Sequence, residues 1–233
     1  MPIDMIAFDA DDTLWHNEVY YQNAIETLTQ TLAKWETPEK IVDSIDKIEI
    51  RNLPLYGYGI KAFILSLIEA AIEISDGEIG GEPITNIIDM GKSMLQAEVA
   101  LKPGVLNALK TLSNDYRMMV ITKGDLLDQT DKVKRSGLQP FFTFIEVVND
   151  KTTPTYRKII DKYGLHSETF VMVGNSLRSD VLPILDIGAS AIYIPSETLW
   201  AHEMVPDFEL PQKGFYELEH IGQLPDLIAT MQM

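Results

Sequence analysis

Residues 3–13 read I-D-M-I-A-F-D-A-D-D-T, a short apolar run followed at once by three acids. No helix cap precedes the run, which predicts a buried strand of a parallel sheet. Asp9, Asp11 and Asp12 lie within four positions, and like charges this close repel unless a cation neutralises them or one holds a proton. The end of this strand is therefore expected to have a function.

Oxygen-rich side chains at the end of a strand favour one kind of site. In an open α/β sheet, ligands bind beyond the carboxyl ends of the strands, where residues 9–13 are expected to lie. Mg²⁺ takes one or two carboxylates there and completes its shell with water and substrate phosphate. The alternative to a metal site is an ordinary acidic turn exposed to solvent, because short D-x-D spacings are common.

Composition limits the class of protein. The chain has 233 residues, 45 % of them hydrophobic, enough for one domain with a large insertion or for two small domains. A net charge of −16 argues against nucleic-acid and anionic-membrane partners, because the protein's field repels polyanions. With no cysteine, no secretory signal and no long apolar run, the sequence predicts a soluble, cytoplasmic protein. It does not predict the oligomeric state.

Residues 15–99 show helical periodicity throughout. Apolar positions recur every three or four residues in four segments, and no convincing strand interrupts them. The stretch N-L-P-L-Y-G-Y-G, residues 52–59, is expected to break the second helix. A helical domain of about four helices is therefore predicted as an insertion between the first and second strands.

From residue 100 onward, strands and helices alternate. Strands are predicted at residues 117–121, 142–148, 170–173 and 191–194, with an edge strand within 215–221 and a final helix over 224–231. Single helices between strands are typical of right-handed βαβ units. The fold class is therefore α/β, with a doubly wound parallel sheet formed by residues 1–14 and 100–233.

The spacing Asp9-x-Asp11-x-Thr13 after a buried strand resembles the first motif of the haloacid dehalogenase superfamily, in its phosphatase and phosphotransferase branch. The resemblance implies that Asp9 is a nucleophile and that Asp11 is the general acid/base. It also implies a Rossmannoid core, with residues 15–99 as a helical cap that closes over the site and selects the substrate.

The second and third motifs of that family have matches at strand ends. Thr122 closes V-I-T-K-G, where a hydroxyl can donate to phosphoryl oxygens, and Lys123 beside it is either a substrate contact or a solvated lysine. Lys151, in N-D-K-T-T-P, fits the lysine of the third motif. A cation there would neutralise the repulsion between an attacking carboxylate and an anionic phosphate.

The fourth motif, commonly G-D-x-x-x-x-D, is matched by G-N-S-L-R-S-D at residues 174–180. Its first acid is the amide Asn175, whose carbonyl can ligate Mg²⁺ without contributing charge. The resemblance thus implies Mg²⁺ as cofactor, bound by Asp9, the backbone carbonyl of Asp11 and Asp180, with Asn175 as a direct or water-mediated ligand.

The function implied is Mg²⁺-dependent hydrolysis of a small phosphorylated metabolite through an aspartyl-phosphate. The alternatives are a phosphomutase or phosphotransferase of the same superfamily and a non-catalytic binding protein on the same scaffold. Dehalogenation is less favoured, because displacing halide needs no general acid at Asp11. A zinc-protease site at His202-Glu203 is excluded by the lack of a second histidine at the required spacing. The substrate itself is not predicted.

Overall fold

The computed structural model describes residues 3–196, 198, 200–203, 205 and 213–231. These residues form two compact units. One comprises Met1–His16, Val99–Lys123 and Gln129–Met233, and the other comprises Asn17–Glu98 and Gly124–Asp128. The first unit contains the sheet, and the second consists mainly of helices.

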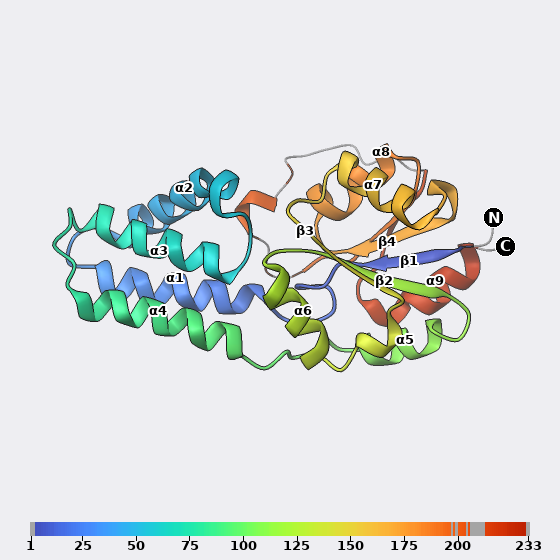
Figure 1. The fold of residues 1–233 in the computed structure, drawn as a ribbon, viewed down its shortest axis with the longest axis horizontal. Helices are drawn as coiled ribbons and strands as arrows, with labels where there is room; N and C mark the ends of the chain where they lie inside the picture. The colour runs from blue at the N-terminus through green and yellow to red at the C-terminus, as the bar shows by residue number, and fades with distance from the viewer. Residues whose placement is uncertain (1–2, 197, 199, 204, 206–212, 232–233) are drawn as a thin grey trace. The chain divides into compact units, whose positions relative to one another are not determined.

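The sheet has six parallel strands in the order β3-β2-β1-β4-β5-β6. Their bounds are β1 Met5–Phe8, β2 Arg117–Lys123, β3 Phe144–Val148, β4 Phe170–Gly174, β5 Ser190–Tyr193 and β6 Phe215–Glu217. Every neighbouring pair is parallel, and helices cover both faces (Figure 1). The predicted doubly wound α/β fold is confirmed.

Alternating side chains of the strands serve two separate cores. Met5 and Ala7 face the cluster that contains Tyr156 and Ile184, from the helices drawn above the sheet in Figure 1. Ile6 and Phe8 face the opposite cluster. Because successive strand residues point to opposite faces, an apolar residue at every position of β1 is what burial on both faces requires.

The helices of the first unit follow the strands. They are α5 Val105–Leu112, α6 Leu126–Arg135, α7 Thr153–Tyr163, α8 Leu182–Asp186 and α9 Leu224–Met231. Helix α6 begins in the segment Gly124–Asp128, which belongs to the second unit, and continues into the first. Short 3-10 helices lie at Gln139–Phe141, Ser167–Thr169, Ala201–Glu203 and Ile221–Gln223.

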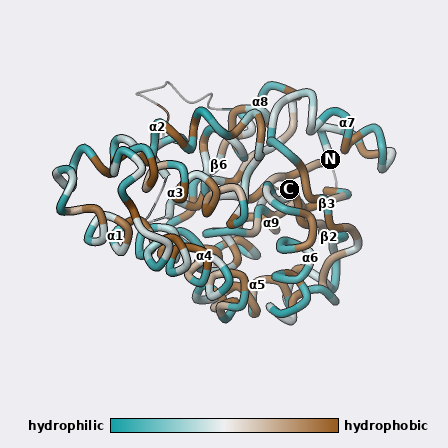
Figure 2. Tube along the Cα trace, turned by 60° about the vertical axis from the view of Figure 1, so that its left-hand side comes forward, coloured by the Kyte–Doolittle hydropathy of each residue, from teal (hydrophilic) through white to brown (hydrophobic). Residues whose placement is uncertain are grey.

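The second unit contains α1 Glu18–Leu32, α2 Pro38–Tyr56, α3 Ile60–Ile74 and α4 Gly81–Gln96. Its core repeats at helical spacing, for example at Leu28 and Leu32 on α1 and at Ile41 and Ile45 on α2. Figure 2 shows hydrophobic and hydrophilic residues alternating along these helices. Asp125, in the segment Gly124–Asp128, belongs to this unit and accepts from Lys61 Nζ at 2.9 Å.

The helix break expected at residues 52–59 is confirmed at residues 57–59, but its first part, residues 52–56, is helical. Helix α2 continues to Tyr56 with Pro54 inside it, and the Gly57 N–H then donates to the Leu53 carbonyl at 2.9 Å. The buried Asn52 donates to Ser66 Oγ at 3.1 Å and to a Glu69 carboxylate oxygen at 2.9 Å on α3. These contacts support the helix where Pro54 removes a backbone donor.

The helical segment between β4 and β5 is divided in two. A π-helical turn spans Leu177–Val181, and α8 follows with Pro183 in its first turn. Such single turns widen a helix locally and are frequent at functional sites. In the part of the chain that the structure describes, no helix is long and apolar enough to cross a membrane.

Candidate active site

The site begins at Asp9, the first residue after β1. Phe8 pairs with Val120 on one side and with Val173 on the other, and the Asp9 N–H donates to the Val173 carbonyl at 2.9 Å. Asp9 is thus held at the carboxyl end of the central strand, and it is buried. Burial in this position takes the carboxylate out of water, so it needs partners within the protein.

Lys151 is the principal partner of Asp9. Its Nζ donates to Asp9 Oδ1, and it also donates to Asp180 Oδ1 at 2.7 Å. The lysine side chain is 1 % exposed. Lys151 comes just before α7, whose first turn is capped by Thr152. One buried ammonium therefore bridges two carboxylates that lie far apart in the sequence.

Burial and charge perturb both ends of this pair. Burial, together with the charges of Asp180 and Asp11, raises the pKa of Asp9 to about 7, although Lys151 opposes the shift. Burial lowers the pKa of Lys151, but the charges of Asp180 and Asp9 outweigh it and raise that pKa above its usual value. The lysine thus stays a cation while Asp9 titrates near neutrality, a pattern typical of functional sites.

Thr13 and Gly174 bring the remaining oxygens close. Thr13 Oγ1 lies 2.9 Å from Asp9 Oδ2 and 3.1 Å from Asn175 Oδ1. The Ser176 N–H donates to Asp180 Oδ2 at 3.1 Å. A Cβ on Gly174 would lie 2.3 Å from the Asp180 carboxyl group, so only glycine permits this approach.

These residues fit a hard divalent cation by their chemistry. Asp9 and Asn175 share Thr13 through their side-chain oxygens, and Asp9 and Asp180 share Lys151 through theirs. Oxygen is the ligand type that Mg²⁺ prefers, and two carboxylates are within the number it takes. Among the described residues, no three acidic or histidine side chains form a metal cluster. A cation here would therefore need the amide of Asn175, a backbone carbonyl and water to complete its shell.

The side chain of Asp11 has a separate set of partners. Trp15 Nε1 donates to Oδ1 at 2.7 Å, Gln129 Nε2 donates to Oδ2 at 2.8 Å, and Lys132 Nζ lies 3.1 Å and 3.3 Å from the two oxygens. Gln129 also accepts from Thr122 Oγ1 at 3.2 Å. Gln129 therefore joins the two residues expected to act on the leaving group and on the phosphoryl oxygens.

Lys123 belongs to a third network, centred on Glu203. Lys123 Nζ donates to Glu203 Oε1, and it donates to Ser179 Oγ at 2.9 Å. Ser176 Oγ and Ser179 Oγ both donate to Glu203 Oε2, the latter at 2.6 Å. Burial raises the pKa of Glu203, but Lys123 and the serine hydroxyls outweigh it and hold this pKa at about 2.

Glu203→Gln is expected to destabilise the protein by on the order of 3 kcal/mol at neutral pH, the equivalent of the shift from 4.5 to about 2. Because the folded pKa lies below the ordinary one, this stabilisation is present above pH 4.5 and is lost as the pH falls from 4.5 toward 2. Free energies of unfolding in urea, measured from neutral pH down through this interval, follow it. The exposed Glu219→Gln is the control, and equal small losses for both variants would contradict the ion pair.

Three of these residues give little signal in the sequence. Gln129 and Lys132 resemble ordinary polar positions of a surface helix, although both are in fact buried. Glu203 follows a histidine, and the only pattern that this pair resembles in the sequence is part of a zinc motif. The sequence candidates themselves lie within three connected groups. The first group contains Asp9, Lys151, Asp180 and Asn175. The second contains Asp11 and Thr122, which Gln129 connects, and the third contains Lys123.

A family model described as haloacid dehalogenase-like hydrolase matches residues 3–188. The crystal structure of a haloacid dehalogenase-like family hydrolase from Xanthomonas campestris is similar, with a TM-score of 0.88 and 35 % sequence identity. That similarity covers 98 % of this chain and 91 % of the other.

Two curated relatives are phosphatases. The N-acylneuraminate-9-phosphatase of Rattus norvegicus is 23 % identical over 239 residues, covering 97 % of this chain and 94 % of that protein. The glyceraldehyde 3-phosphate phosphatase of Methanothermobacter thermautotrophicus is 34 % identical over 90 residues. The second match spans 36 % of this chain and only 40 % of that enzyme.

Proposed function

The chain belongs to the haloacid dehalogenase-like hydrolase family, and from this premise we propose that it is a Mg²⁺-dependent phosphatase acting on a small phosphorylated metabolite through an aspartyl-phosphate. The observation that carries the proposal is the buried Asp9 carboxylate bound to Lys151 at the end of the central strand. A nucleophile beside a fixed cation suits attack on an anion. The phosphatases among the curated relatives support this reading.

In the first half of the proposed reaction, a carboxylate oxygen of Asp9 forms a bond to phosphorus. The bond from phosphorus to the ester oxygen breaks, and that oxygen leaves with the electron pair and takes a proton from Asp11. Lys151 offsets the repulsion between the carboxylate and the phosphate. Thr122 donates a hydrogen bond to a phosphoryl oxygen once its hydroxyl turns from Gln129.

In the second half, a water molecule attacks the phosphorus of the aspartyl-phosphate. Asp11, now a carboxylate, accepts a proton from this water, and the bond between phosphorus and Asp9 breaks. Inorganic phosphate leaves and Asp9 is regenerated. The same residue therefore serves as acid and then as base. A role for Lys123 in substrate binding stays a prediction, since its ammonium already bonds Glu203 and Ser179.

Mg²⁺ would be held by Asp9, Asp180, the side-chain carbonyl of Asn175 and the backbone carbonyl of Asp11. When bound, it supplies positive charge that orients the phosphate and shields it from the carboxylates. The chain's own contribution is to hold these oxygens together. Thr13 does this for Asp9 and Asn175, and Gly174 allows Asp180 to approach.

A rate screen tests the proposed function directly. The protein is assayed at neutral pH with Mg²⁺ against a panel of phosphorylated metabolites. Parallel assays use 2-haloacids as substrates, or add alcohols and sugars that could accept the phosphoryl group. Release of inorganic phosphate from a monoester is the expected result. Halide release would instead assign a dehalogenase, transfer to an acceptor would assign a phosphotransferase, and no turnover of any compound would favour a binding protein.

The metal requirement gives a second expected result. Activity should disappear in excess chelator and return with Mg²⁺, while Ca²⁺ should substitute poorly because its larger, looser shell misplaces the carboxylate. Asp180→Ala should raise the Mg²⁺ midpoint strongly, since it removes a charged ligand, and Asn175→Asp should hold or lower it. Titrating activity against Mg²⁺ measures both. Full activity in chelator, or a midpoint unchanged in Asp180→Ala, would contradict these assignments.

A further inference from the structure

The carboxylate of Asp11 is already saturated with protein donors. Trp15, Gln129 and Lys132 together make four contacts with its two oxygens, each within 3.3 Å. An ionised carboxylate offers about four lone-pair sites. Such a set of donors fixes the orientation of the carboxylate, and its members include residues of α6 as well as the neighbouring Trp15.

Lys132 supplies the only full charge in this set. Its side chain is 8 % exposed, while that of Asp11 is 21 % exposed, so the pair is partly shielded from water. Opposite charges that are partly buried attract each other more strongly than an equally spaced pair on the open surface. The acids of the site thus have separate counter-ions, with Lys151 serving Asp9 and Asp180 and Lys132 serving Asp11.

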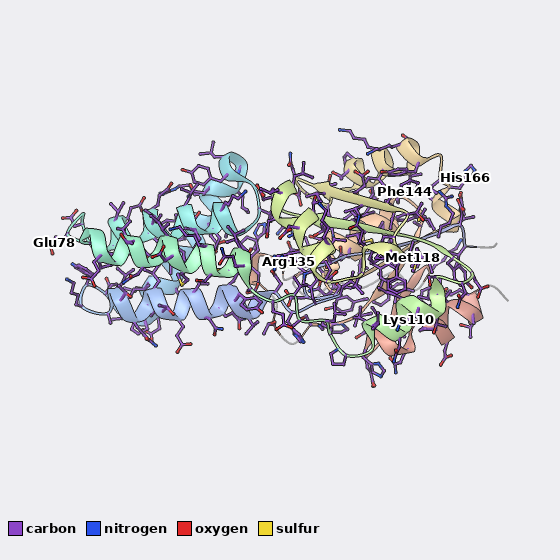
Figure 3. All side chains as sticks on the ribbon, turned by 60° about the horizontal axis from the view of Figure 1, so that its bottom comes forward. Glu78, Lys110, Met118, Arg135, Phe144 and His166 are labelled. Carbon is purple, nitrogen blue, oxygen red and sulfur yellow. The ribbon has the colours of Figure 1, made fainter. Side chains whose placement is uncertain are left out.

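Gln129 lies three positions before Lys132 on the same face of α6, the helix that ends at Arg135 in Figure 3. Its amide accepts from Thr122 with one end and donates to Asp11 with the other. These two bonds fix which way the amide points. Because Val133, which follows Lys132 in the sequence, packs in the hydrophobic cluster that also contains Ile6 and Phe8, the helix that presents both residues is itself anchored.

We propose that Lys132, together with Gln129, is a positioning residue for the general acid/base, holding the Asp11 carboxylate in the orientation from which it exchanges protons with the leaving oxygen and with water. The inference rests on the proposed phosphatase function. In this proposal Lys132 acts on the reaction through Asp11, with which it forms an ion pair.

The geometry also indicates how Asp11 can work while it is held. Lys132 contacts both oxygens at similar distances, 3.1 Å and 3.3 Å, whereas Trp15 and Gln129 each hold one oxygen at 2.7 Å and 2.8 Å. A small shift of the ammonium onto one oxygen frees a lone pair on the other and keeps the ion pair. The ion pair can therefore persist during proton transfer, and Lys132, Trp15 and Gln129 hold the orientation of the carboxylate together.

A double-mutant cycle tests the proposal. Lys132→Met should lower kcat for an alkyl phosphate by roughly 10- to 100-fold, the scale expected when a reacting group is misplaced by about 1 Å. The loss should be smaller for p-nitrophenyl phosphate, whose departing oxygen needs little protonation. In the Asp11→Asn background, Lys132→Met should cause almost no further loss, because two residues that act as one unit are not additive.

Matched variants separate positioning from general damage. Lys132→Arg should recover part of the lost rate, and Lys134→Met, an exposed lysine on the same helix, should match the wild type. Multiplicative losses in the double variant, or equal losses on both substrates, would overturn the proposal.

Crystal structures give a readout independent of turnover. In Lys132→Met the Asp11 carboxylate should leave Trp15 and Gln129, and an unmoved carboxylate overturns the proposal. A wild-type protein without phosphatase activity would refute the proposed function, and these crystal structures would then still decide the role of Lys132.

Discussion

Asp9→Asn is expected to lower kcat on phosphate monoesters by on the order of 10³-fold or more, the scale of loss when a covalent nucleophile is removed. The amide has nearly the same shape as the carboxylate but is a poor nucleophile. The aspartyl-phosphate should also be absent. Steady-state rates and intact-protein mass after rapid acid quenching measure the two effects.

The same variant should fold as well as the wild type or better. Burial raises the pKa of Asp9 from 3.8 to about 7, so its contribution to stability is lost as the pH rises through this interval. At pH 8 the wild type carries that cost and the amide does not. Thermal unfolding at pH 8 measures the difference, and Asp4→Asn, an exposed acid just before the same strand, is the control.

If Asp9→Asn kept more than about a tenth of the wild-type rate, the covalent mechanism would be contradicted. A rate that falls only together with the melting temperature would point to damage of the fold instead. Loss of activity with unchanged or raised stability is the combination that a nucleophile predicts, because catalytic groups are commonly held at a cost to stability.

Lys151→Met is expected to have the second largest effect, and on two measurements at once. The substitution leaves Asp9 and Asp180 facing each other without the ammonium that bridges them. Removing one partner of a buried ion pair typically costs about 3–5 kcal/mol, because the remaining charge is left without compensation. Turnover should fall as well, since no cation then offsets the repulsion between Asp9 and phosphate.

Denaturant unfolding in chelator isolates the stability effect of Lys151→Met from any effect of bound metal. Lys158→Met, an exposed lysine on the same helix α7, is the matched control and should be near neutral. Lys151→Arg should not restore activity, because the planar guanidinium cannot take the place of a compact ammonium between two carboxylates. Near-normal stability in Lys151→Met would argue that the bridge is not intact in solution.

Local chemistry in the sequence was enough to predict the sheet and the order of its strands along the chain. The run of residues 3–8 is apolar at nearly every position, as a strand buried on both faces must be, and acids follow it where the strand has to end. Thr122, Lys151 and Asp180, at or near the ends of later elements, were identified by the resemblance to family motifs, each of which is a short run of neighbouring residues. These are properties of neighbouring residues, so they can be read without knowing the fold.

Partners from distant parts of the chain were decided by the tertiary structure. Lys151 bridges Asp9, 142 positions away, and Asp180, 29 positions away, because strands β1 and β4 are neighbours in the sheet. Lys132 also pairs with Asp11, and Glu203 pairs with Lys123, because folding brings distant segments together. Neither pair follows a local pattern in the sequence. The continuation of α2 through Pro54 likewise depends on contacts of Asn52 with α3. Local preference and periodicity determine which elements form, whereas the packing of those elements determines which charged side chains meet.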